Sequence, residues 1–114
     1  MKALDPRAAA RAAVAANPAR PATAIIHDEP DARLVVFRLA PGQAVPPHRS
    51  ASTVLLTVLE GAGVLSGEDG GAPQERACAA GDAVAYAPNE LHGMRAEEQE
   101  LLLLATITPR PGGR

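Results

Sequence analysis

The sequence predicts an all-β sandwich or barrel that carries a short N-terminal helix. After residue 22, short apolar runs alternate with Gly, Pro, Asp and Asn at roughly the eight- to twelve-residue spacing of short strands joined by turns. The chain has 114 residues, enough for one core, and its residues are 46% hydrophobic but only 2% aromatic. We therefore expect one domain built on Ala, Val, Leu and Ile, with a helix and connector at 1–22, a barrel at 23–108 and a flexible tail at 109–114.

The N-terminal segment has the signals of a helix. Asp5 suits the N-cap, Pro6 suits the first helical position, and the Ala/Arg run as far as Ala16 has high helix propensity. Asn17 and Pro18 end the helix. Because few of its side chains are large and apolar, we expect it to dock on the domain or on a partner subunit, or to fray.

Eight strands are expected, at 23–28, 32–39, 52–59, 63–66, 74–78, 83–87, 93–96 and 101–108. Turn-forming residues mark the breaks between them, such as Pro41-Gly42, Gly61-Ala62-Gly63 and Pro88-Asn89. Periodicity leaves Leu101 to Leu104 ambiguous between a buried helical turn and a strand. The β-branched continuation that ends at Pro109 favours a strand.

Composition and charge exclude several classes of function. A formal net charge of -2 and the scarcity of aromatics argue against a nucleic-acid-binding surface, and Arg49 has the parity of an outward, solvated charge. No stretch approaches the roughly 18 consecutive apolar residues of a membrane span. Cys78 is the only cysteine, which rules out an intrachain disulfide and favours a reducing compartment. We therefore expect a cytoplasmic protein without nucleic-acid or membrane partners.

Two histidines each follow a proline-containing turn at the entrance to a strand. Residues of one parity share a face of a strand, which places Ser50 and Val54 on the face of His48, and Met94 on the face of His92. If these faces point inward, the two imidazoles meet in one mouth of the barrel. The pattern therefore predicts a site at His48 and His92.

The same regions resemble the two motifs of the cupin superfamily. The matching elements are Gly42-x5-His48, Leu59-Glu60-Gly61, Gly81-Asp82, Pro88-Asn89 and His92-Gly93. The resemblance covers about residues 32–108 and identifies a small single-domain cupin. It implies an antiparallel jelly-roll barrel, often a homodimer, which in many cupins holds a divalent metal on three His and one Glu.

Only part of that ligand set is present. His48 matches the first histidine of motif one and His92 the histidine of motif two, whereas Ser50 stands at the second histidine and Val54, or Thr53 in a shifted register, at the glutamate. Two imidazoles bind an ion more weakly than three imidazoles and a carboxylate. A divalent metal (Zn, Fe, Mn or Ni) is therefore expected to be weakly held, unless a ligand comes from elsewhere. The candidates for such a ligand are Glu90, Cys78 and His27.

The favoured function is binding of a small molecule inside the barrel. Its expected polar contacts are His48, Ser50 and His92, and the remaining expected contacts are Val54, Met94 and Tyr86, whose hydroxyl is a further donor. The alternative is a metal-dependent enzyme of dioxygenase or isomerase type, with His48 and His92 as ligands. The sequence leaves open whether the protein is an enzyme.

A third hypothesis is a structural or interaction module in which an apolar face pairs two subunits. This face would carry Leu55, Leu59 and Leu101 to Leu104. Leu and Val on both faces of 54–59 favour burial on both sides, so we expect a homodimer whatever the function. A pH-dependent switch is a further hypothesis, because histidine titrates near neutral pH. Nothing in the sequence favours it over the others.

Overall fold

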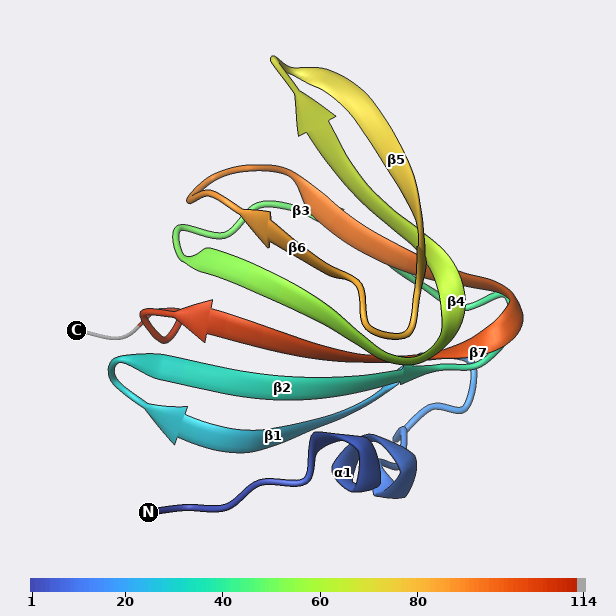
Figure 1. Cartoon of the computed structure of the whole chain (residues 1–114), viewed down its shortest axis with the longest axis vertical. Helices are drawn as coiled ribbons and strands as arrows, with labels where there is room; N and C mark the ends of the chain where they lie inside the picture. The colour runs from blue at the N-terminus through green and yellow to red at the C-terminus, as the bar shows by residue number, and fades with distance from the viewer. Residues whose placement is uncertain (113–114) are drawn as a thin grey trace.

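The computed structural model describes residues 1–112 (Figure 1). One helix precedes seven strands: α1 (Pro6–Ala12), β1 (Ala22–Glu29), β2 (Ala32–Leu39), β3 (Ala44–His48), β4 (Thr53–Asp69), β5 (Ala72–Ala79), β6 (Ala83–Tyr86) and β7 (His92–Thr108). The described residues contain no helix that is both long and apolar enough to cross a membrane. The predicted all-β fold with a short N-terminal helix is confirmed.

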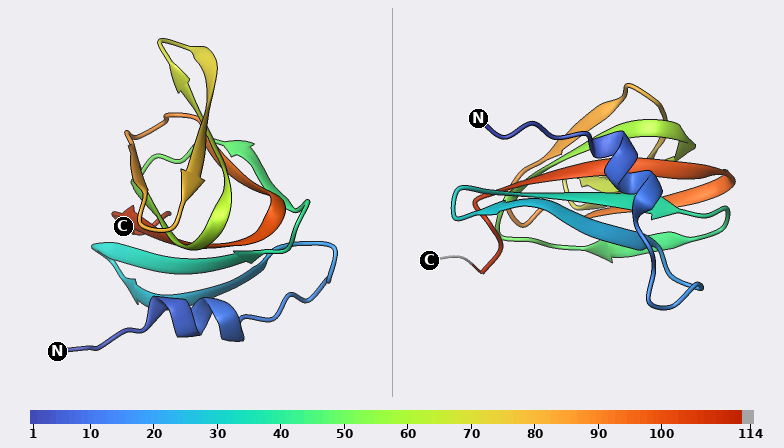
Figure 2. Two further views of the ribbon diagram at one scale, coloured as in Figure 1. Left: turned by 45° about the vertical axis from the view of Figure 1, so that its right-hand side comes forward. Right: turned by 90° about the horizontal axis from the view of Figure 1, so that it is seen from below.

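The strands form one antiparallel sheet that curls around the core without closing (Figures 1 and 2). The order is β1-β2-β7-β4-β5, with β3 added to β7 and β6 added to β4. The long strands β4 and β7 pair with each other and change their outer partners along their length. β7 borders β3 and then β2, while β4 borders β6 and then β5. This exchange gives the jelly roll its two facing halves.

Two breaks expected from the sequence are bends within strands. Gly61-Ala62-Gly63 lies inside β4, whose register against β7 shifts between Val58 and Glu60 and again between Gly61 and Gly63. A bulge adds a residue to one strand and bends it, so β4 passes from one half of the sheet to the other without a loop. β7 likewise joins the expected strands 93–96 and 101–108. The strand expected at Leu101 to Leu104 is confirmed.

Strand β3 was not expected, because Pro46 and Pro47 indicate a turn. The strand tolerates them because it pairs with β7 alone, and the register shifts between Val45 and His48, across the two prolines. Proline is compatible with an edge strand, where a missing N–H breaks no ladder on the free side. As a result, His48 is the register partner of His92.

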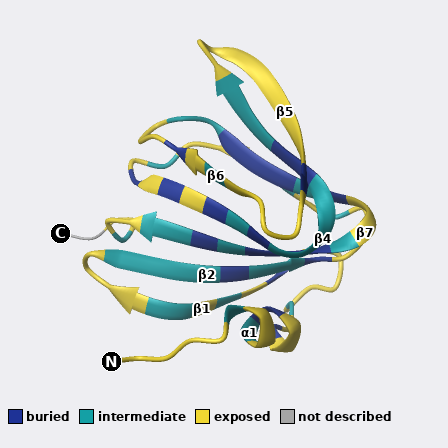
Figure 3. Ribbon diagram, in the orientation of Figure 1, coloured by how far each residue is buried: buried dark blue, intermediate teal, exposed yellow. Residues whose placement is uncertain are grey.

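The core lies between the two halves of the sheet (Figure 3). Val54, Leu56 and Val58 of β4 are each at most 3% exposed, which confirms that the even-numbered face points inward. They pack with Leu101 and Leu103 of β7 in one cluster. The strand period predicted from the sequence therefore sets which side chains of β4 reach the interior.

Helix α1 covers the outer face of β1 and β2 (Figure 2). The predicted N-cap is confirmed, since the amide of Ala8 donates to Asp5 at 3.1 Å. The helix ends at Ala12 and not at the expected Ala16. The next residue, Ala13, accepts a hydrogen bond on its carbonyl oxygen from Arg38 at 2.6 Å.

The helix packs on apolar side chains of that outer face. Ala10 is fully buried against Val36 and Leu102, with Leu59 and Leu104 beside them. Part of the face that the sequence assigned to a second subunit is therefore covered by the chain's own helix.

The tail was expected to be flexible from Pro109 onward, but its first residues contact the barrel. The Pro109 carbonyl accepts a hydrogen bond from Ser52 Oγ at 2.7 Å, and the Arg110 amide donates to the Pro30 carbonyl at 3.2 Å. The Arg110 guanidinium also pairs with Asp28 at 3.5 Å. These contacts tie residues 109–110 to Ser52, just before β4, and to β1 and the turn that follows it. Residues 113–114 of the expected tail lie outside the described residues.

Candidate functional site

The structure brings His48 and His92 together. The two residues are register partners on β3 and β7, and their ring centroids are 4.2 Å apart with an angle of 59° between the ring planes. His92 is buried at 5% exposure, whereas His48 is exposed. The imidazole of His92 is therefore shielded from solvent, and that of His48 is open to it.

Both imidazoles use the same ring nitrogen to contact the backbone. His48 Nδ1 lies 3.0 Å from the Pro46 carbonyl oxygen, and His92 Nδ1 lies 3.2 Å from the Glu90 carbonyl oxygen. A carbonyl oxygen can only accept, so in each contact Nδ1 carries the proton and donates. In a neutral ring this leaves Nε2 with a free lone pair. The pair of histidines thus presents two hydrogen-bond acceptors.

Burial keeps His92 in this neutral form. Desolvation is the main cause that lowers the pKa of His92 below its ordinary value of 6.5, and the nearby His48 lowers it further. The hydrogen bond to the Glu90 carbonyl acts in the opposite direction but is the smaller effect. Near neutral pH, His92 is therefore an uncharged acceptor.

A cavity of about 400 Å³ opens beside the two histidines. Its polar rim includes His48, Ser50 and His92, and its apolar wall includes Phe37, Val45, Val54, Leu56, Met94, Ala105 and Ile107. Its size falls within the usual range for small-molecule pockets of roughly 300 to 1,000 Å³. Five of the six side chains expected at the binding site lie on this cavity.

Ser50 adds a hydroxyl to the rim. Its Oγ accepts a hydrogen bond from the Ser52 amide at 3.1 Å. Because a hydroxyl can accept and donate at once, the hydroxyl hydrogen of Ser50 is still available to a ligand. The two imidazoles and Ser50 therefore contribute two acceptors and one donor, beside Arg49, whose guanidinium is paired with Glu68.

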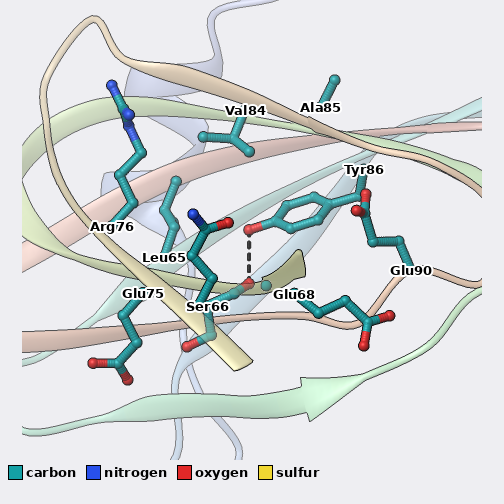
Figure 4. A pocket seen from close by; sticks show the side chains of 11 residues that line it. Leu65, Ser66, Glu68, Glu75, Arg76, Val84, Ala85, Tyr86 and Glu90 are labelled. Carbon is teal, nitrogen blue, oxygen red and sulfur yellow. Dashed lines mark hydrogen bonds between the residues drawn. The ribbon is translucent and has the colours of Figure 1, made fainter. Parts of the chain in front are cut away.

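Tyr86 does not face this cavity, which corrects the expectation from the sequence. Its hydroxyl donates to the Ser66 carbonyl at 2.9 Å and lines a separate hollow of about 270 Å³ near Glu68 and Glu90 (Figure 4). Burial raises the pKa of Tyr86 to about 12. The ring still packs against His92, with centroids 5.2 Å apart. Tyr86 therefore supports an imidazole and does not offer its hydroxyl to the cavity.

The three candidates for an additional metal ligand lie elsewhere. Glu90 accepts a hydrogen bond from the Ala87 amide at 2.9 Å, Cys78 is buried on β5 opposite Gly63, and His27 on β1 lies near Lys2. None of the three lines the cavity. Within residues 1–112, no group of three or more His, Cys, Asp or Glu side chains could hold a metal ion.

The side chains at the cavity therefore do not fit a catalytic metal centre. Such centres keep three protein ligands, or two histidines and a carboxylate. Here the position expected for the carboxylate holds Val54, whose methyl groups form part of the apolar wall.

Several residues that line the cavity were not among the side chains expected at the site. Ala105 and Ile107 have the parity of the inward face of β7, so the two-residue period could have identified them. Pro111 also lines the cavity, although nothing in the local sequence indicates that the chain returns there. Arg49 was expected to be a solvated charge, but it pairs with Glu68 at the edge of the site.

Comparison with known proteins agrees with this architecture. A family model described as the cupin domain matches residues 35–108. The TT1209 protein of Thermus thermophilus is 26% identical, with 97% of this chain and 100% of that chain covered and a TM-score of 0.82. An RmlC-like cupin from Desulfovibrio desulfuricans is 28% identical, with 86% and 91% covered and a TM-score of 0.70.

A third similar structure is KdgF from Halomonas sp., at 23% identity, with 86% of this chain and 87% of that chain covered and a TM-score of 0.75. At this identity the likeness concerns the fold alone. No curated protein matches the chain. The family match spans well over half of the sequence, and the fold is similar to those of the structures above. The chain therefore belongs to the cupin family.

Proposed function

We propose that this cupin binds a small, largely apolar molecule in its cavity through His48, Ser50 and His92. The observation that carries the proposal is that two imidazoles, each with Nδ1 bonded to backbone, and one serine line a largely apolar cavity. Small-molecule sites have this form, with apolar walls that supply affinity and a few polar groups that orient the ligand.

The protonation of the rim indicates what the ligand carries. Two Nε2 lone pairs call for hydrogen-bond donors, such as a hydroxyl or an amine, and Ser50 can donate to an oxygen on the same molecule. A carboxylate would bring its lone pairs against those of the imidazoles, and the lowered pKa of His92 opposes the protonation that would relieve this conflict. The favoured ligand is therefore an alcohol or an amine with an apolar body.

A metal-dependent enzyme is the second candidate, because the same Nε2 lone pairs are what a divalent ion requires. Its ligand set is limited to two imidazoles, and Val54 adds no charge to offset desolvation of the ion. We therefore place binding of an organic ligand ahead of it.

A screen of small alcohols and amines by ligand-observed NMR tests the proposal. Compounds that bind should lose about tenfold or more in affinity in H92A, since an unpartnered polar group costs about 1 to 3 kcal/mol. A105L, which fills the cavity, should also weaken binding. H27A is the matched control, because His27 lies on β1 away from the cavity, and it should bind as the wild type does.

Equal binding to wild type, H92A and A105L would contradict the proposal. Plasma emission analysis of the purified protein adds an independent check. We expect less than stoichiometric divalent metal, and a full equivalent that is lost in both H48A and H92A would favour the metal-dependent enzyme instead.

We also propose a homodimer. Some apolar side chains stay exposed outside the area covered by α1, notably Ile25 at 54% and Leu55 at 38%. Light scattering should give the mass of two chains, and a monomer at the same concentration would contradict this expectation.

A further inference from the structure

The ion pair between Arg49 and Glu68 lies directly beside the two histidines. Arg49 follows His48 in the chain, and its guanidinium contacts the carboxylate of Glu68 through both terminal nitrogens. Nη1 donates to Oε1 at 2.6 Å and Nη2 donates to Oε2 at 3.2 Å. Such paired contacts restrict orientation as well as distance. Arg49, the residue next to His48, is therefore held in one geometry against Glu68 of β4.

The same carboxylate reaches the chain beside the second histidine. Leu91, which directly precedes His92, donates its amide to Glu68 Oε1 at 3.2 Å. Arg49 Nη1 also donates to the Asn89 carbonyl at 2.8 Å. One side chain of β4 thus joins the neighbours of both imidazoles.

The segments joined by Glu68 lie just beyond the β3–β7 pair that His48 and His92 form. The pairing of β4 with β7 ends at Ser66 and Gly93, so Glu68 extends past the ladder toward the segment 87–91. The segments on the two sides also meet directly, because the Asn89 amide donates to the Ser50 carbonyl at 2.6 Å. In the described part of the chain, Glu68 is the residue of β4 that anchors this junction.

The carboxylate is suited to that role. Its side chain is only 15% exposed, against 57% for Glu75 in the other two-pronged Arg–Glu pair of the described chain, between Arg95 and Glu75. The hydrogen bond from Arg49 is the main cause that holds the pKa of Glu68 below its ordinary value, and the Leu91 amide contributes. Glu68 therefore stays ionised at neutral pH, with its partners fixed.

We propose that Arg49 and Glu68 are positioning residues that hold His48 and His92 at the separation at which both imidazoles reach one ligand. The proposal rests on the proposed function, because the separation of the rings matters for binding only if both imidazoles contact one ligand. Its geometric content, the separation of the rings, is measurable without any ligand. A small displacement of a binding group away from its productive position is enough to weaken binding, which is why the junction matters.

E68Q tests the proposal, with E75Q as the matched control. Glu75 pairs with Arg95 in the same two-pronged way, and neither residue lines the cavity. The first readout is the NOE between the ring protons of His48 and His92. The second is titration with Zn²⁺ alone while the ring nitrogen signals of the two histidines are followed by NMR, which reports on this pair of imidazoles and on no other site.

We expect E68Q to weaken the NOE and to lower the Zn²⁺ affinity of the pair by about tenfold, the lower end of the effect of removing a group that orients a ligating histidine. E75Q should change neither. R49M keeps the contact between Glu68 and Leu91 and should weaken the NOE as well, which covers the case in which E68Q does not fold.

An unchanged NOE and an unchanged Zn²⁺ titration in E68Q and R49M would overturn the proposal. Its failure is distinct from failure of the proposed function. If the NOE weakens in E68Q but no compound binds the wild type, the positioning role stands without an organic ligand. If compounds bind wild type and E68Q alike and the NOE persists, the binding function stands without the positioning role.

Discussion

Substitution of Gly61 by alanine is expected to destabilise the fold far more than the same change at Gly71. Both glycines have the left-handed backbone that disfavours other residues, with φ values of +82° and +87°. They differ in their surroundings. A Cβ on Gly61 would overlap the carbonyl oxygen of Glu100 on β7, whereas a Cβ on Gly71 would meet nothing within 4 Å. The comparison therefore isolates the close approach of β4 to β7.

Two effects set the loss of stability in each variant. Left-handed backbone costs a residue with a Cβ about 1 to 2 kcal/mol, and both variants share this cost. Overlap with a packed neighbour adds about 1 to 3 kcal/mol in G61A, since the obstacle is backbone in a paired strand and cannot rotate away. For a domain of this size, that difference lowers the Tm of G61A below that of G71A by about 4 to 12 °C.

Urea unfolding followed by far-UV circular dichroism measures the difference. We expect a lower midpoint for G61A with an unchanged slope, which indicates a loss of stability without a change in the unfolded state. Equal midpoints for G61A and G71A would show that β4 and β7 can separate at the bulge at no cost, and would refute the reasoning.

Three further predictions concern the site. Ser50→His combined with Val54→Glu places the missing donors at the cavity and should raise Zn²⁺ affinity by on the order of a hundredfold in calorimetry; no gain would mean that these positions do not converge. Tyr86→Phe should cost about 1 kcal/mol of stability in urea unfolding and leave ligand affinity unchanged, because its hydroxyl contacts backbone outside the cavity; weaker ligand binding in this variant would contradict the placement of Tyr86. The lowered pKa of Glu68 means that its stabilisation is complete above the ordinary value of 4.5 and is lost as the pH falls through the lowered pKa. The difference in unfolding free energy between wild type and E68Q should therefore shrink as the solution is acidified below that ordinary value, and a difference that stays constant with pH would contradict this.

Local patterns predicted most of the fold because they act within a few residues. The two-residue period of 52–59 identifies the inward side chains of β4, and Asp5-Pro6 identifies the start of α1. Local patterns do not distinguish a glycine in a turn from a glycine in a bulge. The same residue type marks the turn at Gly70-Gly71 and the bulge at Gly61, and only the pairing with β7 distinguishes the two.

Local patterns also placed most of the expected site residues on one cavity, although their role in binding stays a prediction. Position relative to a strand entrance was enough to single out His48 and His92, and strand parity was enough to add Ser50, Val54 and Met94. Tyr86 was misplaced because its hydroxyl reaches the Ser66 carbonyl and not the cavity. That partner belongs to a distant part of the chain, so no pattern around Tyr86 indicates it.

The sequence alone settles that this chain folds as a small cupin and that its first motif keeps one histidine of the usual set, since both follow from residue types at short spacing. The tertiary structure decides what the remaining groups can do. The register of β3 against β7 brings His48 to His92, the backbone carbonyls leave both Nε2 atoms free, and Glu68 links the two segments that carry the imidazoles. These contacts join residues far apart in the chain, and their geometry is set by strand register and bulges, which local sequence patterns do not encode.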